Sequence, residues 1–431
     1  LIIVASVVLL VAILSWIIPS GTYDYQEMNI NGRIRNVAID GTYHTIDKSE
    51  VTTTGFLGFF SVLYRGCVEA ADVIFMILCC CGTFGVVVKT GAFHAGIGTI
   101  LKKLKGKEIL LVPIIMLIFG LGGSVFGMAS EFYGFYPLIV GLGVALGYDA
   151  MFGFAIIAVG EFVGFMGATL NPYSVGIAQT ISGVELYSGT GYRTICFVIF
   201  MVISIIYVMM YGRKIKKNPG ASVVFGEKNI HAFDRDELNE YSFTLKDGLV
   251  LLDVLVVLVV LMFGLIKWGW DFPQLCGLFL LMSMIAAAIC KWSPNKWCSE
   301  FIDSAKTAMW GCILTGIAKA ITVVMQDAQI MDTVIYGLSN VLKNAPHAVS
   351  AQVMLVVQTL INFFIPSATG QASATMPIMA QLADIIGVSR QTAVLAFQFG
   401  DGLSNIFWPT ADIVIICGLG GISLQKWYKW F

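Results

Sequence analysis

The segment from Ile361 to Asp412 is apolar enough for a lipid bilayer, yet it contains two interruptions, Pro366–Gln371 and Gly400–Asn405. A helix that breaks inside hydrocarbon exposes backbone N–H and C=O groups that lipid cannot satisfy, and each such group is costly. Breaks of this kind persist only where protein, water or a bound solute covers them. The segment therefore predicts a ligand site, formed by a re-entrant hairpin tip that faces an unwound helix.

The first half of the chain contains a segment with the same organisation. An offset of 240 residues aligns acidic Glu161 with acidic Asp401 without a gap. The same offset aligns further identical residues: Pro137 with Pro377, Leu142 with Leu382, Gly147 with Gly387 and Gly160 with Gly400. Interrupted segments at corresponding places in two halves point to the binding site of a transporter. The alternative is that the glycine-rich kinks only allow helices to pack closely.

The composition places the chain in a bilayer. Of its 431 residues, 57% are hydrophobic and only 12% are charged, with a mean hydropathy of +0.83. Soluble domains carry roughly 25% charged residues, so we predict an all-α polytopic membrane protein. A net charge of −1, without a cluster of basic and aromatic residues, argues against a nucleic-acid partner.

The sequence lacks the motifs of enzymes and metal sites. Its ten cysteines form no CxxC pair, and Cys79–Cys81 is expected to lie in an apolar helix. It has no Walker loop, no GxSxG elbow and no HExxH motif. We therefore expect neither an enzyme nor a cofactor, apart from a coupling sodium ion or proton.

The first repeat is expected to cover residues 1–212. Pro172 explains one break, because proline lacks an N–H donor and disfavours helix at the preceding Asn171. The predicted elements are a span at 1–18, an external loop with a small hairpin at 19–54, an interfacial arm at 55–66, a span at 68–88, a re-entrant hairpin at 109–147 with its tip at 122–131, a broken span at 150–182 and a span at 190–212.

The second repeat is expected to cover residues 273–431. A hydrophilic linker at 213–246 and an extra span at 247–267 precede it, and this added crossing inverts the second repeat. Its predicted elements are a span at 273–290, an arm at 293–306, a span at 307–325, a re-entrant hairpin at 349–387 and a broken span at 391–424. The counterpart of the span at 190–212 would begin near residue 430, so we expect the native protein to carry one further span.

The basic residues predict the orientation. They are concentrated at 102–107, 213–217, 291–296 and 426–429, and a path that places all four runs on one side is self-consistent. Cytoplasmic loops carry an excess of lysine and arginine, so these loops are predicted to be cytoplasmic. The first hairpin then enters the membrane from the cytoplasm and the second from outside.

Four acids lie at predicted mid-membrane depth, namely Glu131, Glu161, Asp401 and Asp412. An ionisable group there costs about 2.5 kcal/mol or more and usually has a partner. The acids either act as caps or pair with Lys306 or Lys319, or they bind a cation or the cationic end of a substrate. The other predicted substrate ligands are Ser124, Asn171, Ser367, Thr369, Gln371, Ser373 and Asn405, and a possible sodium site comprises Thr169, Asn171, Ser404 and Asn405.

Three segments resemble a known family. They are FFIPSATGQASATMPIMAQLADIIGVSRQTAVLAFQFGDGLSNIFWPTA at 363–411, SWIIPSGTYDY at 15–25 and GATLNPYSVGIAQ at 167–179. They closely resemble the YfcC-like carriers, which are described as basic amino-acid antiporters or as anaerobic four-carbon dicarboxylate carriers of the ion transporter superfamily. The resemblance implies a multi-pass protein of a bacterial cytoplasmic membrane and a homodimer of inverted repeats. It also implies a scaffold domain and a transport domain that moves as an elevator.

Carried over by position, the resemblance implies two half-sites. The first would comprise Ser124–Glu131 and Thr169–Ser174, and the second Ser367–Ser373 and Asp401–Asn405. Dicarboxylate carriers of the superfamily often have a Ser-Asn-Thr signature at each tip. This chain lacks that signature, which disfavours dicarboxylate transport, although each break contains an asparagine.

The acids decide the predicted substrate. A dicarboxylate site needs buried arginine or lysine, and only Lys319 lies deep in a predicted span. Four acids favour a cationic solute such as arginine or ornithine, exchanged by antiport. The alternative is sodium- or proton-coupled uptake of a dicarboxylate or a neutral peptide-like solute. A channel would need a continuous polar stripe, and an intramembrane enzyme built on Glu161 and Asp401 would need a nucleophile or metal ligands.

Overall fold

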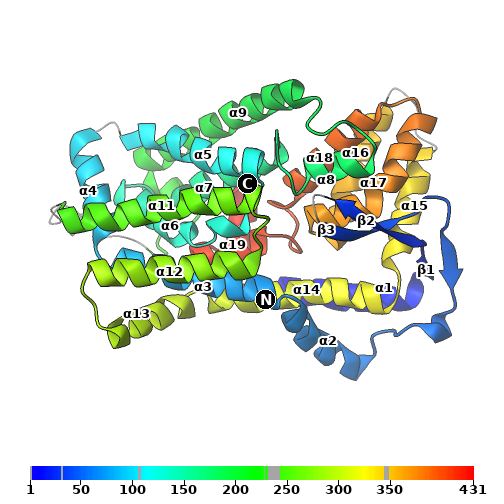
Figure 1. The fold of residues 1–431 in the computed structure, drawn as a ribbon, viewed down its shortest axis with the longest axis horizontal. Coiled ribbons are helices and arrows are strands. Elements are labelled where there is room, and N and C mark those ends of the chain that lie inside the picture. The colour runs from blue at the N-terminus through cyan, green and yellow to red at the C-terminus, as the bar shows by residue number, and fades with distance from the viewer. Residues whose placement is uncertain (1, 31–32, 105–107, 228, 232–242, 344–348) are drawn as a thin grey trace.

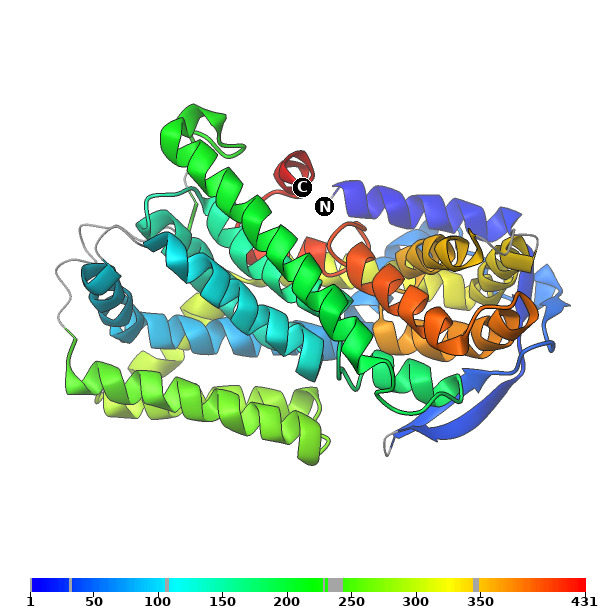
Figure 2. The same ribbon diagram turned by 90° about the horizontal axis from the view of Figure 1, so that it is seen from above.

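The computed structural model describes residues 2–30, 33–104, 108–227, 229–231, 243–343 and 349–431, and it is mostly helical. Within these ranges, five helices are long and apolar enough to cross a membrane. They are α3 (Ala71–Lys89), α9 (Thr190–Lys217), α11 (Leu245–Lys267), α12 (Phe272–Ile289) and α14 (Met309–Asp327). Figures 1 and 2 show α3, α11, α12 and α14 running roughly along the long axis of the molecule, while α9 crosses it diagonally in Figure 2. The predicted class, a mostly helical membrane protein, is therefore confirmed.

A polar segment after α1 (Ile2–Ile17) forms the small β structure that its alternating residues predict. β2 (Tyr25–Ile30) pairs antiparallel with β3 (Arg33–Ala38), and β1 (Ser20–Thr22) pairs antiparallel with β4 (His44–Ile46). Asp332, in the first turn of α15 (Met331–Lys343), accepts hydrogen bonds from the Tyr25 hydroxyl at 2.7 and 2.9 Å. The β structure is thereby attached to the helix that leads into the second hairpin.

The two arm helices exchange partners between the halves. α2 (Phe56–Glu69) packs on α14, and α13 (Pro294–Lys306) packs on α3. Likewise, α1 packs on α14 and α12 packs on α3. The contact of α2 with α14 depends on Gly66, because a Cβ there would lie 2.4 Å from the backbone oxygen of Gly316. Small residues allow this close approach of helices in a membrane.

Each half contains a helical hairpin followed by a broken helix. Figures 1 and 2 show the group α5–α7 at one end of the molecule and the group α16–α18 at the other. The first group comprises α5 (Leu111–Leu121), a π-helical turn (Gly122–Phe126), α6 (Phe135–Ala145) and α7 (Ala150–Met166). α8 (Val175–Ile181), which follows the first break, packs on α17 and α18 of the other group. The second group comprises α16 (Ser350–Phe364), α17 (Ala368–Ile385) and α18 (Arg390–Ser404). α19 (Ile413–Gly420), which follows the second break, packs on α14 and on α6 of the first group.

The second break lies partly outside its predicted position. The predicted interruption is at Gly400–Asn405, but α18 continues to Ser404 and the non-helical segment is 405–412. Gly402 serves packing instead, because a Cβ there would lie 2.4 Å from the Cα of Met166. The break falls around Pro409, which has no N–H to donate and disfavours helix in the residue before it.

The second tip is also shorter than the sequence indicates. α16 ends at Phe364 and α17 begins at Ala368, so Thr369–Gln371 lie in the first turn of α17. Two further helices, α4 (Ala92–Leu104) and α15, precede the hairpins, where the sequence analysis assigned no element. The remaining elements are α20 (Leu424–Trp430) and short 3₁₀ helices at Lys48–Glu50, Glu108–Leu110, Ser130–Phe132 and Pro219–Ala221.

Two predicted features fall partly outside the described residues. The basic run at 102–107 loses residues 105–107, and the linker at 213–246 loses residues 228 and 232–242, which include its acidic segment.

Candidate functional site

Ser124 joins the first hairpin tip to the first helix break. It is fully buried in the π-helical turn. Its carbonyl oxygen accepts hydrogen bonds from the backbone N–H groups of Thr169 and Leu170 at 2.9 and 3.2 Å. Its hydroxyl donates to the carbonyl oxygen of Gly167 at 3.1 Å and lies 3.1 Å from Oγ1 of Thr169. The tip thus satisfies peptide groups that the break leaves without helical partners.

Asn171 fixes the turn after this break. Its Oδ1 accepts hydrogen bonds from the backbone N–H groups of Tyr173 at 2.9 Å and Ser174 at 3.1 Å. Its Nδ2 donates to the carbonyl oxygen of Gly123 at 3.4 Å. Gly127, at the end of the tip, has a φ of 69°, and a Cβ there would lie 2.4 Å from Oδ1 of Asn171. The tip and the Asn171 turn therefore fit together only with glycine at this position.

The second break is hydrogen-bonded to the hairpin of its own half. The Trp408 indole N–H donates to the carbonyl oxygen of Thr359 at 2.7 Å. The Thr410 hydroxyl donates to the carbonyl oxygen of Phe363 at 2.7 Å. Both acceptors belong to α16, so polar side chains of the break supply partners for the hairpin backbone. This arrangement keeps residues 405–412 close to the second tip.

Two hydrogen bonds connect the halves crosswise. The Thr369 hydroxyl, next to the second tip, donates to the carbonyl oxygen of Tyr173 in the first break at 2.9 Å. The Tyr133 hydroxyl, next to the first tip, donates to Oδ1 of Asp412 in the second break at 3.4 Å. Each tip therefore lies beside the break of the other half. The residues around both breaks, which are far apart in sequence, are brought together at the middle of the molecule.

Glu161 on α7 and Asp401 on α18 occupy buried positions in the two halves, each with no exposed surface. The Tyr136 hydroxyl donates to Oε2 of Glu161 at 2.7 Å, and Nδ2 of Asn362 donates to Oδ1 of Asp401 at 2.7 Å. Within the described part of the chain, Oε1 of Glu161 and Oδ2 of Asp401 have no hydrogen-bond partner. Each acid thus has one oxygen held by a neutral donor and one oxygen free.

A buried amide network extends from Asp401 into the second hairpin. Nδ2 of Asn362 also donates to Oε1 of Gln371 at 2.9 Å, and Nε2 of Gln371 donates to Oε1 of Gln358 at 2.7 Å. Nε2 of Gln358 donates to the hydroxyl of Thr375 at 3.1 Å. Because polar groups in hydrocarbon need partners, this network holds α16, α17 and α18 in one arrangement.

A cavity of about 540 Å³ lies between the tips, the second break and α14. This volume is within the range of roughly 300–1,000 Å³ for small-molecule sites. Its charged lining residues are Glu69, Lys319 and Asp412, and its polar lining residues include Ser130, Tyr133, Thr315, Gln326, Ser367 and Thr410. It is the candidate substrate cavity, because it adjoins both tips and contains residues of the second break.

The predicted substrate residues fall into three groups. Ser367 and Asp412 line the substrate cavity. Thr369 and Ser373 lie in the first two turns of α17, where the Ser373 hydroxyl donates to the carbonyl oxygen of Thr369 at 2.9 Å. The others are buried within the hairpins and broken helices: Ser124, Glu131, Glu161, Asn171, Gln371, Asp401 and Asn405.

The oxygens of the predicted sodium residues already have partners within the protein. Oγ1 of Thr169 contacts Ser124, and Oδ1 of Asn171 accepts two backbone hydrogen bonds. The Ser404 hydroxyl donates to the carbonyl oxygen of Gly400 at 2.5 Å, and the carbonyl oxygen of Asn405 accepts from the N–H of Ile413 at 3.2 Å. Sodium binding by these residues stays a prediction.

Sequence analysis did not place two basic residues at the site. Lys319 lies on α14 but faces the substrate cavity, which the helix alone could not indicate. Arg193 is 1% exposed beside the first break, where its guanidinium donates to the carbonyl oxygen of Ser188 at 2.8 Å and to that of Thr169 at 3.5 Å. The signal for Arg193 was a basic residue in the first turn of an apolar span.

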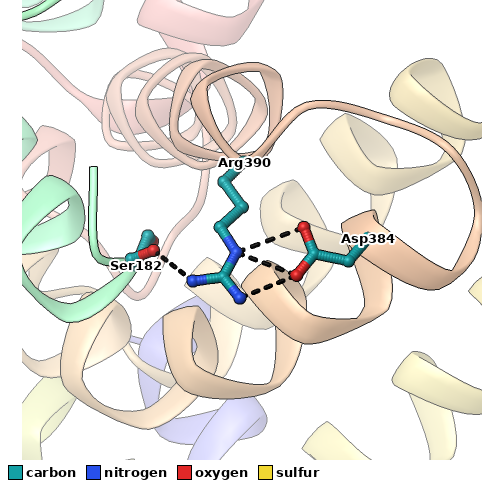
Figure 3. A network of polar contacts seen from close by, with 3 residues as sticks. All are labelled: Ser182, Asp384 and Arg390. Carbon is teal, nitrogen blue, oxygen red and sulfur yellow. Dashed lines mark hydrogen bonds and ion pairs between the residues drawn. The ribbon is translucent and has the colours of Figure 1, made fainter. Parts of the chain in front are cut away.

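A polar cluster of Arg390, Asp384 and Ser182 connects α8 with α17 and α18; the hairpins and the broken helices together are called the hairpin assembly below. Figure 3 shows Arg390 between Asp384 at the end of α17 and Ser182 at the end of α8. Its Nε lies 2.9 Å and its Nη2 2.7 Å from Oδ2 of Asp384, and its Nη1 donates to the carbonyl oxygen of Ser182 at 2.9 Å. The cluster joins the first broken helix to the base of the second hairpin.

Comparison with known proteins identifies the family of the chain. Residues 1–431 match the family model of the C4-dicarboxylate anaerobic carrier, DcuC. The chain belongs to the DcuC family. Within this family, it is 32% identical to YfcC of Escherichia coli (strain K12), provisionally named a basic amino acid antiporter, over 100% of this chain and 91% of YfcC. The predicted resemblance to YfcC-like carriers is therefore confirmed.

Two further similarities cover nearly the whole DcuC-family chain. An uncharacterized protein of Haemophilus influenzae is 28% identical over 95% of this chain and 83% of its own length. The crystal structure of the Alcanivorax borkumensis YdaH transporter matches with a TM-score of 0.43 and 13% identity, over 100% of this chain and 94% of that one. As a member of the DcuC family, the protein is a membrane transporter of the YfcC type.

Proposed function

We propose that the protein is an antiporter that exchanges basic amino acids such as arginine and ornithine. The observation that carries this proposal is the charge of the substrate cavity, where Glu69 and Asp412 are two acids against the single base Lys319. A site with excess negative charge favours a cationic solute over a dianion. The provisional name of the YfcC relative points to the same substrate class.

The proposed mechanism is an elevator movement of the hairpins and broken helices against a scaffold that contains α3 and α14. Its basis is a pair of inverted repeats. The exchange of arms, α2 onto α14 and α13 onto α3, is the pattern that a two-fold relation between the halves produces. The crosswise contacts of Thr369 with Tyr173 and of Tyr133 with Asp412 follow the same pattern. A homodimer through the scaffold is part of this proposal.

The proposed orientation follows from the ends of the helices. Figures 1 and 2 show the end of α4 and the turn between α12 and α13 at the end of the molecule where α9 also finishes. Lys426 extends this side, because its ammonium donates to the carbonyl oxygen of Val223 at 2.8 Å, just after α9. We assign this side to the cytoplasm of a bacterial inner membrane, since basic loops stay cytoplasmic.

A second candidate is sodium- or proton-coupled transport of a four-carbon dicarboxylate or a neutral peptide-like solute. One observation favours the dicarboxylate: Lys319 places an ammonium group in the substrate cavity, where a carboxylate could bind. The description of the family model names the same class of solute. Both acids of the cavity would then need protons, a sodium ion or other cationic partners.

Counterflow in proteoliposomes tests the proposed function. Vesicles containing the purified protein are loaded with arginine, ornithine or succinate, and entry of the same labelled solutes is followed. Arginine and ornithine are expected to exchange with each other, while empty vesicles show little uptake. Exchange of succinate alone would refute the cationic substrate in favour of the second candidate.

A further inference from the structure

Lys319 is a charged residue in the interior of α14, whose other charged residue, Asp327, is its last. It lies in the middle of α14 (Met309–Asp327), which is long and apolar enough to cross a membrane. In the part of the chain that the structure describes, its ammonium group makes no ion pair and no hydrogen bond, and it faces the substrate cavity. A charge at this depth is costly unless it meets a counter-charge, so Lys319 is expected to have a partner that enters the cavity.

Of the two scaffold acids near the cavity, Asp327 is neutralised by Arg65, whereas Glu69 is not. Arg65, one helical turn before Glu69, donates two hydrogen bonds to the carboxylate of Asp327, at 2.5 and 2.9 Å. This bidentate pair balances its own charges. Glu69 has no ion-pair partner among the described residues, and it lines the substrate cavity together with Asp412 and Lys319. The cavity therefore presents two negative groups and one positive group.

These charges are the complement of one class of solute. A basic amino acid carries an α-ammonium group, a cationic side chain and an α-carboxylate. We propose that Lys319 binds the α-carboxylate of the transported basic amino acid, while Asp412 and Glu69 bind its two cationic groups. This assignment rests on the proposed function and adds a requirement to it, namely that the solute must carry a carboxylate.

The three charged residues of the cavity also lie on both of the parts that move relative to each other in the proposed elevator mechanism. Asp412 belongs to the second break and contacts Tyr133 beside the first tip, whereas Lys319 and Glu69 belong to α14 and α2. A solute bound to all three bridges the hairpin assembly and the scaffold helices. A decarboxylated analogue reaches only the acids, and it leaves Lys319 without a counter-charge.

The test compares arginine with agmatine, which keeps the amine and the guanidinium but lacks the carboxylate. Competition against labelled arginine counterflow is measured for the wild type, Lys319→Met and Lys319→Arg. In the wild type, arginine is expected to compete at least roughly tenfold better than agmatine. Lys319→Met should remove this preference by weakening arginine alone, and Lys319→Arg should restore part of it. Lys306→Met is the matched control, because Lys306 is exposed on α13 and pairs with Asp303.

Agmatine binding reports whether Lys319→Met is folded. The assignment of Lys319 is overturned if Lys319→Met weakens competition by arginine and agmatine equally, or if it keeps the wild-type preference for arginine. The proposed function is unaffected by either result as long as the wild type exchanges arginine. Exchange of succinate but not arginine by the wild type overturns the proposed function, and this assignment with it.

Discussion

At the scale of single residues, two acids are fully buried and do not line the cavity. Glu161 and Asp401 have no exposed surface and do not line the substrate cavity, and each is held by one neutral donor, Tyr136 or Asn362. Among the described residues, neither carboxyl has a basic hydrogen-bond or ion-pair partner, and an unpaired charge in hydrocarbon is costly. Both residues are thus suited to carry protons or to hold the broken helices in place.

Asp401→Asn is expected to reduce arginine counterflow at least roughly tenfold while the protein stays folded and elutes at the same volume as the wild type. The amide keeps the size of the side chain, but it cannot gain or lose a proton. Counterflow and size-exclusion chromatography together measure this effect. Asp303→Asn is the matched control, since it replaces a carboxylate by an amide in the same way at an exposed position on α13. Near-normal transport by Asp401→Asn would remove this carboxyl from the mechanism.

At the scale of elements, glycines set the distance between the hairpin helices and the broken helices. A Cβ on Gly164 of α7 would lie 2.1 Å from the backbone oxygen of Gly120 at the end of α5. In the second half, a Cβ on Gly400 of α18 would lie 2.8 Å from Cβ of Gln358 on α16. Because the obstacle at Gly164 is backbone, α7 and α5 would have to move apart to admit a side chain.

Gly164→Ala is therefore expected to destabilise the protein by about 1–3 kcal/mol, as overpacking does in close-packed cores. The measurement is the midpoint of thermal unfolding in detergent, with ligand absent. Gly277→Ala in α12 is the control, because a Cβ at Gly277 meets no atom within 4 Å. A control that loses as much stability as Gly164→Ala would show that the close contact of α5 and α7 is not the cause.

At the scale of the whole molecule, α14 contacts both the proposed scaffold and the hairpins and broken helices that are proposed to move against it. Gly311 of α14 meets α19, since a Cβ on Gly418 would lie 3.1 Å from the Cα of Gly311. Gly316 of the same helix meets α2, since a Cβ on Gly316 would lie 3.1 Å from the Cβ of Cys67. Under the elevator proposal, the first contact breaks during transport and the second persists.

Cross-linking separates these two contacts. In a background without the other cysteines, oxidation of Gly311→Cys with Gly418→Cys should block counterflow, and reduction should restore it. Oxidation of Gly316→Cys with the native Cys67 should leave counterflow nearly unchanged, because both residues belong to the proposed scaffold. Cβ atoms of bridged cysteines lie about 3.5–4.5 Å apart, and a Cβ on Gly316 would lie 3.1 Å from the Cβ of Cys67, so this pair needs only a small shift. Full transport by the oxidised Gly311–Gly418 variant would contradict the elevator movement.

The sequence by itself determined the membrane class, the positions of both hairpins, the first break and the family. These features depend on local chemistry. Apolar runs must avoid water, and Pro172 lacks an N–H donor and disfavours helix at the preceding Asn171. The motif at 363–411 carries the family resemblance in contiguous residues. The second break was misplaced because Gly400 and Gly402, which look like helix breakers, instead allow α18 to pack closely within a continuous helix.

Only the tertiary structure decided which charged residues share a cavity. Glu69, Lys319 and Asp412 are separated by long stretches of sequence, and periodicity does not show that α2, α14 and the second break meet. It also does not show that Glu161 and Asp401 are absent from the lining of that cavity and are hydrogen-bonded to Tyr136 and Asn362. The physical reason is that burial of a charge in a membrane protein is fixed by the partners that packing brings to it, and packing joins segments that the chain keeps apart.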